Sequence, residues 1–353
     1  MEKNQQWPSV EEITAHPSFP DAIWKLTPSQ KGSHAVAAGR GGPFNIDWEV
    51  HGSGDIKLVW VMGLGSVKSS WQRQTLRFGH DEHNRYSSLV FDNRGMSSQI
   101  IIFWSDKPLM RYSTSEMAKD VIELLDHLGW NEKRQLHVSG VSMGGMIAQE
   151  IAYLIPDRIS SLNLLSTAAY IENTTTFVEN MQTRIRMLIP KSLDRSVREA
   201  SQSLFPDTWL AAPDNTAVPT ATSPMVVFPP SGKYGSFSTN YERFSAAEIT
   251  KRSDIESFGR TGFILQLIAA GWHHKSPEQL KEIGDKVGRE RIMVMHGTAD
   301  KMISVHHGRK LIEFLQPGTG IIKEGTGHVF MVEECEYHNK MIEEMFQKGE
   351  SSK

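Results

Sequence analysis

The stretch V-S-G-V-S-M-G-G-M-I-A-Q-E, residues 138–150, places Ser142 between glycines where an apolar, β-branched run passes into residues with helical spacing. Glycine lowers helix stability by about 1 kcal/mol relative to alanine, so three glycines around one serine need a reason beyond packing. Residues 140–144 fit G-x-S-x-G, the nucleophile elbow, in which a strained serine sits between a strand and a helix that pass too close for side chains. The stretch therefore predicts that Ser142 is a nucleophile facing the positive end of a helix.

A nucleophilic serine needs a histidine base and a carboxylate that orients the histidine. After an elbow of this kind they are expected in the order Asp, His, each at the carboxyl end of a strand. The stretch R-I-M-V-M-H-G-T-A-D places Asp300 just past one predicted strand, and I-I-K-E-G-T-G-H places His328 just past the next. His296 lies within its strand and ahead of the acid. We therefore predict Ser142, Asp300 and His328 as the catalytic residues.

An oxyanion hole needs two backbone N–H donors. The amide of Met143, the residue after the nucleophile, would be one of them, and the other is expected from the loop after the third predicted strand. That loop reads V-M-G-L-G-S-V-K-S-S-W, with glycines on both sides of Leu64 that would let the Leu64 amide turn inward. We predict Leu64 and Met143 as the oxyanion donors.

Strands and helices alternate through most of the chain. I-K-L-V-W-V-M and S-L-V-F-D are apolar runs typical of strands buried on both faces, and the residues between Ser113 and Gly129 combine a capping residue, helical spacing and a terminal glycine. This alternation predicts an α/β fold in which a mostly parallel central sheet has helices on both faces.

The predicted organisation has five parts. An N-terminal extension with a first strand covers residues 1–45, and the first part of the core covers residues 46–169. Residues 170–274 contain helical stretches and a Pro/Thr/Ser-rich segment but no buried-strand pattern, which is typical of a helical cap inserted over a site. The second part of the core covers residues 275–346, and a polar tail covers residues 347–353.

The composition is that of a globular protein with a large core. The chain has 353 residues, 39% hydrophobic and 22% charged, with a formal net charge of -3 and a single cysteine. No basic cluster suits nucleic acid, and no apolar run suits a signal peptide or a membrane span, so a cytoplasmic protein is expected. The adjacent pairs His273–His274 and His306–His307 would diverge and lack further ligands, so we expect neither a metal nor a cofactor.

The motifs resemble those of a known superfamily. G-V-S-M-G-G-M-I-A-Q (140–149) is similar to the α/β-hydrolase branch that holds enol-lactonases, methyl esterases and cofactor-free haloperoxidase-like esterases. D-N-R-G-M-S-S (92–98) resembles the D-x-R-G-x-G-x-S loop of that branch, and G-T-A-D (297–300) and G-T-G-H (325–328) resemble its acid and base loops. Met62 departs from the histidine that many members carry before the oxyanion donor, and Ser97 departs from a glycine. The resemblance covers the chain from about residue 44 to the last helix.

These features predict a serine hydrolase that cleaves a carboxylic ester or lactone of apolar character. An acyltransferase or a thioesterase would use the same catalytic residues, and a ligand-binding protein without activity could keep the same fold. A serine at the elbow argues against dehalogenase and epoxide hydrolase chemistry, which would need an aspartate there.

Aromatic residues are the candidates for contact with the substrate. We predict Trp71, Phe228 and Trp272 as substrate-binding residues. Other side chains of the insertion would line an acyl pocket or form the core of the cap: Met181, Met187, Met225, Tyr234, Phe237, Tyr241 and Phe244.

Overall fold

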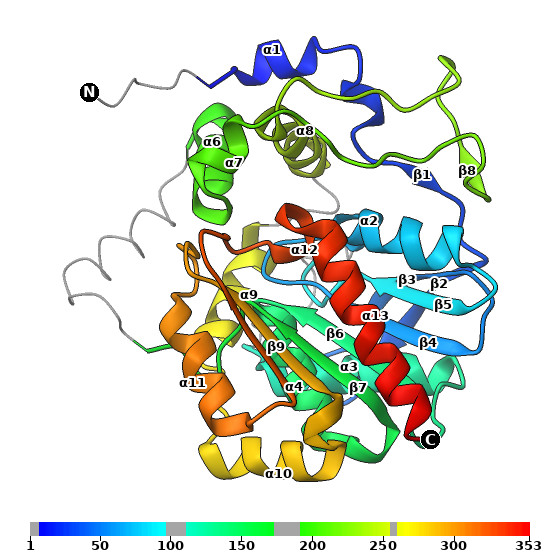
Figure 1. Ribbon diagram of the computed structural model, residues 1–353, viewed down its shortest axis with the longest axis vertical. Coiled ribbons are helices and arrows are strands. Elements are labelled where there is room, and N and C mark those ends of the chain that lie inside the picture. The colour runs from blue at the N-terminus through cyan, green and yellow to red at the C-terminus, as the bar shows by residue number, and fades with distance from the viewer. Residues whose placement is uncertain (1–6, 97–110, 173–190, 255–259) are drawn as a thin grey trace.

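The computed structural model describes residues 7–96, 111–172, 191–254 and 260–353 (Figure 1). Within them, one sheet of eight strands has the order β10-β9-β7-β6-β4-β5-β3-β2. Its strands are β2 (Gln30–Val36), β3 (Phe44–His51), β4 (Ile56–Val61), β5 (Tyr86–Phe91), β6 (Leu136–Val141), β7 (Ile159–Leu165), β9 (Ile292–Gly297) and β10 (Thr319–Lys323). Strand β3 pairs antiparallel with both of its neighbours, β2 and β5, and all other pairings in this sheet are parallel. The predicted mostly parallel sheet is confirmed.

Helices cover both faces of this sheet (Figure 1). One face carries α3 (Thr114–His127), α4 (Met143–Leu154), α10 (Pro277–Val287) and α11 (Val305–Leu315), whose apolar residues share a core cluster with the strands. The opposite face carries α13 (Cys335–Ser351), which shares a core cluster with the short helix α12 (Phe330–Glu333). The short helix α2 (Gln72–Gln74) lies close to both. The predicted helices on both faces are therefore confirmed.

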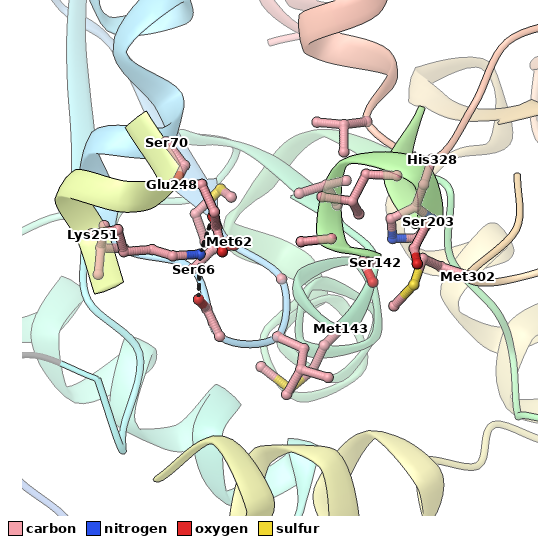
Figure 2. Close-up of a pocket in the computed structure, with 18 of the residues that line it drawn as sticks. Met62, Ser66, Ser70, Ser142, Met143, Ser203, Glu248, Lys251, Met302 and His328 are labelled. Carbon is pink, nitrogen blue, oxygen red and sulfur yellow. Dashed lines mark hydrogen bonds and ion pairs between the residues drawn. The ribbon is translucent and has the colours of Figure 1, made fainter. Parts of the chain in front are cut away.

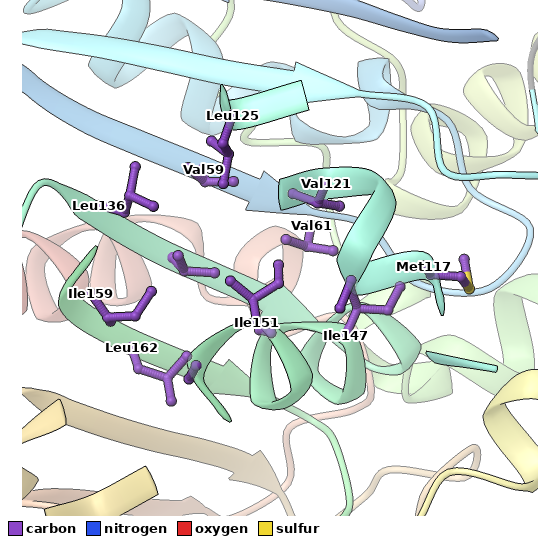
Figure 3. Packing of buried hydrophobic residues seen from close by; sticks show 14 of the residues in the cluster. Val59, Val61, Met117, Val121, Leu125, Leu136, Ile147, Ile151, Ile159 and Leu162 are labelled. Carbon is purple, nitrogen blue, oxygen red and sulfur yellow. The ribbon is translucent and has the colours of Figure 1, made fainter. Parts of the chain in front are cut away.

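The helix α3 illustrates why these residues fold as they do. The Ser113 hydroxyl caps it by accepting from the Glu116 amide at 3.2 Å, and Gly129, with φ of 71°, ends the turn that follows it. Its apolar residues recur at helical spacing, and Figure 3 shows Val121 and Leu125 directed at Val59 and Val61 of β4. Truncating a buried leucine here would cost about 2–5 kcal/mol of stability.

A second layer of helices lies above the carboxyl ends of the strands (Figure 1). We call it the cap; it consists of α6 (Leu193–Leu204), α7 (Asp207–Ala211), α8 (Asn240–Ser253) and α9 (Arg260–Gly271). The N-terminal residues, which include α1 (Val10–Thr14), pack on the cap: Trp7 stacks on Tyr241 with ring centroids 4.5 Å apart, and Ile13 is buried in the same cluster. Strand β1 (Lys25–Leu26) also pairs with β8 (Val226–Val227). The N-terminal extension thus shares a core with the cap.

The expected polar tail at residues 347–353 is wrong as a separate segment. Helix α13 continues to Ser351, and Gly349 is buried where a Cβ would lie 2.6 Å from Ser160 Oγ. Gln347, Lys348 and Ser351 are exposed, whereas Gly349 is buried and Glu350 Oε1 lies 2.9 Å from Nε2 of the buried His137, so one side of this last turn packs on the sheet. Among the described helices, none is long and apolar enough to cross a membrane.

Candidate active site

Ser142 occupies a tight turn between β6 and α4. Its φ of 57° and ψ of −125° place it in a region that residues with side chains rarely adopt, and its carbonyl oxygen accepts from Thr167 Oγ1 at 2.7 Å. The flanking glycines allow the close crossing of strand and helix: a Cβ at Gly140 would lie 2.2 Å from Gly144 O, and one at Gly144 would lie 2.1 Å from Val61 O. The backbone therefore has the geometry of a nucleophile elbow.

Asp300 and His328 are joined by a short hydrogen bond. The distance from His328 Nδ1 to Asp300 Oδ2 is 2.7 Å, and both side chains are buried. The other oxygen, Asp300 Oδ1, accepts from the amides of Met302 at 2.8 Å and Ile303 at 2.9 Å. Because the carboxylate must accept from Nδ1–H, Nε2 of His328 is left free to take a proton.

A second histidine, His296, contacts the same carboxylate. Its Nε2 lies 3.2 Å from Asp300 Oδ2 and 2.8 Å from the carbonyl oxygen of Ile303, so this nitrogen carries the hydrogen and donates. Burial alone would raise the pKa of Asp300, but the charge of His328 and the hydrogen bonds from both histidines lower it well below its ordinary value. The sequence analysis did not assign His296 to the site, although its position four residues before Asp300 was a usable signal.

The loop after β4 lies against Ser142. A Cβ on Gly63 would come within 3.1 Å of the Ser142 Cβ, so the loop and the elbow are in contact. Met62, which stands where a histidine was expected from the resemblance, buries its side chain in the core, and its carbonyl oxygen accepts from Asn93 Nδ2 at 2.8 Å. The side chain of Asn93 therefore anchors this loop through the backbone.

The cap also anchors the loop. Buried Gln266 of α9 accepts from the Gly65 amide at 2.9 Å and donates to the carbonyl oxygen of Arg94 at 2.8 Å, which ties the two loops together. Among the described residues, the amides of Leu64 and Met143 donate to no protein acceptor. Neither of the two predicted oxyanion donors is therefore taken up by a described protein acceptor. Gln266 could not be identified from local sequence patterns because it is 201 residues distant from Gly65.

The histidine loop has its own contact with the cap. The His328 amide donates to the carbonyl oxygen of Leu204, the last residue of α6, at 2.8 Å. On the opposite wall, Lys251 of α8 donates to the carbonyl oxygen of Gly65 at 3.2 Å and pairs with Glu248 at 2.6 Å (Figure 2). The cap therefore contacts the loops on both sides of Ser142.

Ser142 and His328 face one cavity of about 1670 Å³ between the core and the cap (Figure 2). No hydrogen bond links the Ser142 hydroxyl to His328 in the described part of the chain. Such bonds are often long in unliganded sites and tighten when substrate binds. The apolar part of the wall includes Leu64, Met146, Phe244, Ile264, Leu267, Ile268 and Ile303.

Two of the three predicted substrate-binding residues lie away from this cavity. Trp71 is fully buried in the core, where its ring lies 5.0 Å from that of Trp60. Phe228 packs on Tyr234, with ring centroids 5.8 Å apart, in a small cluster beneath β8. Neither residue lines the cavity, because large apolar rings serve core packing as readily as ligand contact. Trp272 does line the cavity, with 72% of its surface exposed at the rim.

Among the other candidates of the insertion, Phe244 lines the cavity. Four others do not line it: Tyr241 lies in α8, and the remaining three lie in the segment between α7 and α8, namely Met225, Tyr234 and Phe237. Met181, Met187 and Ser97 lie outside the described residues. Within the part of the chain that the structure describes, no group of three or more His, Cys, Asp or Glu side chains is placed to hold a metal ion.

Glu333 supports the histidine loop from below. Its Oε2 accepts from the amide of Gly327, next to His328, at 2.7 Å, and burial raises its pKa from an ordinary 4.5 to about 7. Because the pKa of this carboxyl group is higher in the folded protein than in the unfolded chain, the protonated group stabilises the fold. This contribution to the free energy of unfolding is fully present below pH 4.5 and is lost as the pH rises through 7.

We expect Glu333→Gln to remove this dependence because glutamine keeps the acceptor without the charge. We take the unfolding free energy of the variant minus that of the unmodified protein. This difference should be larger at pH 8 than at pH 5 by about 1–2 kcal/mol, after discounting for solvent screening. Urea unfolding at the two pH values measures the gain. The matched change Glu313→Gln, on the exposed side of α11, should show no such difference, and an equal effect of Glu333→Gln at both pH values would contradict the assignment.

Comparison with known proteins identifies the fold family. The family model for the alpha/beta hydrolase fold matches residues 58–334. An Azorhizobium caulinodans protein assigned as the carbamate hydrolase RutD is 27% identical over 179 residues, 50% of this chain and 60% of that protein. The 3-oxoadipate enol-lactonase 2 of Acinetobacter baylyi is 32% identical over 114 residues, 32% of this chain and 38% of its own length. The chain thus matches only part of each relative.

Solved structures extend the similarity of fold along most of the chain. A thermophilic esterase from Thermogutta terrifontis has a TM-score of 0.63 and 18% identity, covering 91% of this chain and 99% of its own. The enol-lactonase from Burkholderia xenovorans LB400 has a TM-score of 0.61 and 18% identity, covering 90% of this chain and 100% of its own.

Proposed function

Because the chain belongs to the alpha/beta hydrolase fold family, we propose that it is a serine hydrolase that cleaves carboxylic esters or lactones. The observation that carries this proposal is the strained Ser142 on a cavity that it shares with His328, which is hydrogen-bonded to Asp300. Strained backbone of this kind needs a surrounding structure that holds it, and a purely structural turn would not require it.

In the proposed reaction, Ser142 Oγ attacks the carbonyl carbon while His328 Nε2 takes its proton. Asp300 holds the imidazole through Nδ1–H and stabilises the charge that forms on it. The amides of Leu64 and Met143 stabilise the oxyanion, and the positive end of α4 adds to their field. His328 then returns the proton to the leaving alcohol, and water releases the acid by the same steps in reverse. For a lactone the leaving alcohol stays within the product.

The cap supports a substrate with an apolar portion. Phe244, Leu267 and Ile268 of the cap line the cavity together with Leu64. Burying apolar groups of a substrate here would contribute about 25 cal/mol per Å² of surface removed from water. The names of the partly matched relatives, a carbamate hydrolase and an enol-lactonase, are consistent with hydrolysis at a carbonyl carbon.

The proposal is tested by labelling and turnover. A fluorophosphonate should modify the protein once, and peptide mapping should locate the label on Ser142, because only an activated serine reacts with this reagent. A panel of 4-nitrophenyl esters of graded acyl length and a set of simple lactones should reveal hydrolysis. A protein that takes up no label and hydrolyses none of these compounds would be a ligand-binding protein, and the proposal would fail.

A further inference from the structure

Two arginines of different elements line the same part of the active-site cavity. Arg73 belongs to α2, which follows the loop that carries Leu64, and Arg243 belongs to α8 of the cap. Arg73 donates to the carbonyl oxygen of Val332 at 2.9 Å and to Thr216 Oγ1 at 2.9 Å. Within the described chain, no carboxylate lies within ion-pair distance of Arg73. The two oxygens that accept from Arg73 at 2.9 Å are both neutral, while Asp214 and Cys335 act on its charge without an ion pair.

Arg243 forms an ion pair with Asp214, but one nitrogen of its guanidinium group, Nη1, has no hydrogen-bond partner among the described residues. Its Nε and Nη2 both contact Asp214 Oδ2, at 2.8 and 2.7 Å, and Nη2 also donates to the carbonyl oxygen of Gly235. The side chain is about 95% buried, since only 5% of the residue is exposed, and its Nη1 has no hydrogen-bond partner among the described residues. An unsatisfied charged donor in a buried position costs several kcal/mol unless a ligand satisfies it.

Asp214 is hydrogen-bonded to groups other than Arg73. Its Oδ2 accepts from the Phe237 amide at 2.9 Å as well as from Arg243, and its Oδ1 accepts from the Thr216 amide at 3.1 Å. The cluster thus holds two guanidinium groups and one carboxylate, which is paired with Arg243, and this leaves one excess positive charge. Burial lowers the pKa of Arg73 and the nearby charge of Arg243 lowers it further, whereas Cys335 and Asp214 raise it.

We propose that Arg73 and Arg243 bind a carboxylate of the substrate, so that the enzyme prefers esters or lactones that carry a carboxylate remote from the scissile bond. Guanidinium groups offer planar pairs of N–H donors that match the two oxygens of a carboxylate. Val332 follows His328 by four residues and α2 follows the Leu64 loop, so the cluster adjoins the catalytic loops. This inference rests on the proposed hydrolase function, whose failure the experiments below detect separately.

The first experiment measures a ratio within each protein. We would compare kcat/KM for 4-nitrophenyl hemiesters of succinic, glutaric and adipic acids with that for the same esters methylated at the free carboxylate. At the best chain length the unmodified protein should prefer the anionic ester at least about 10-fold, and Arg73→Met should reduce this preference about 10- to 100-fold. Arg73→Lys, which keeps the charge but not the planar donor pair, should retain part of it.

The control removes a different cation from the cavity wall. Lys191 also lines the cavity and pairs with Glu199. Glu199 also pairs with Arg195 at 2.7 Å, so it keeps a cationic partner when Lys191 is replaced. Lys191→Met therefore makes the same charge change outside the arginine cluster and should leave the ratio within about twofold. Equal rates on anionic and neutral esters in the unmodified protein, or an equal loss on both in Arg73→Met, would overturn the proposal.

The second experiment needs no turnover. Monomethyl adipate, monomethyl glutarate and monomethyl succinate would be titrated calorimetrically into Ser142→Ala, with and without Arg73→Met. The best of them should bind at least about 10-fold more weakly when Arg73 is replaced. If no ester is hydrolysed but this loss is seen, the proposed function fails and the carboxylate site stands. Absence of saturable binding to Ser142→Ala at low salt, for all three compounds, would overturn the carboxylate site itself.

Discussion

Replacing Ser142 with alanine is expected to lower kcat for ester hydrolysis by about 10⁶-fold, because the attacking oxygen is lost and the residual rate comes from binding and the oxyanion donors alone. The fold should tolerate the change. In the described part of the chain the Ser142 hydroxyl donates no hydrogen bond to the protein, and alanine has the same Cβ, so the strained backbone gains no new clash. Stability should change by less than about 0.5 kcal/mol. Steady-state hydrolysis of an activated ester and urea unfolding measure the two effects.

Ser203→Ala is the matched control, because Ser203 also lines the cavity (Figure 2) but its hydroxyl donates to the carbonyl oxygen of Glu199. This variant should keep activity within about tenfold and should still accept a fluorophosphonate. Retention of more than a few per cent of activity in a homogeneous preparation of Ser142→Ala would show that another residue is the nucleophile.

Much of the fold followed from local patterns. Apolar runs, capping residues and terminal glycines mark the strands and helices individually, and the alternation of strands with helices fixes their parallel direction. In such a sheet the carboxyl ends of the strands share one edge, so residues just past β6, β9 and β10 are brought together by topology alone. For this reason Ser142, Asp300 and His328 could be selected from the sequence. Ser142 and His328 line the same cavity, and Asp300 is hydrogen-bonded to His328.

The rest depended on contacts between distant segments. Gln266 holds Gly65, and Asn93 holds Met62, yet neither polar side chain stands in a pattern that differs from an ordinary surface residue. The packing of Trp7 on Tyr241 joins the N-terminal residues to helix α8, more than 200 residues away, and periodicity within either segment carries no signal of that contact. Long-range pairing of this kind is set by tertiary structure, and sequence spacing within one segment does not encode it.

Replacing Asp300 with asparagine should lower kcat by about 10⁴-fold through the tautomer of His328. Two amides, those of Met302 and Ile303, donate to Oδ1, so the asparagine oxygen would take that position and its NH₂ would face the imidazole. Nδ1 of His328 would then have to accept, which places the proton on Nε2 and removes the base that Ser142 needs. Steady-state kinetics at pH 7 to 9 measures the loss, and a thermal melt verifies the fold.

Glu333→Gln is the matched carboxylate-to-amide control, since Glu333 contacts the same loop through the Gly327 amide. It should change kcat by less than about fivefold at any pH where both proteins are folded, because the glutamine oxygen still accepts that hydrogen bond. A large loss in Glu333→Gln with near-normal turnover in Asp300→Asn would assign the orienting role to Glu333 instead.

His296→Gln tests the second contact on Asp300 separately. If His296 only helps to hold the carboxylate in place, its loss should cost far less than that of Asp300, because the hydrogen bond from His328 Nδ1 to Asp300 remains.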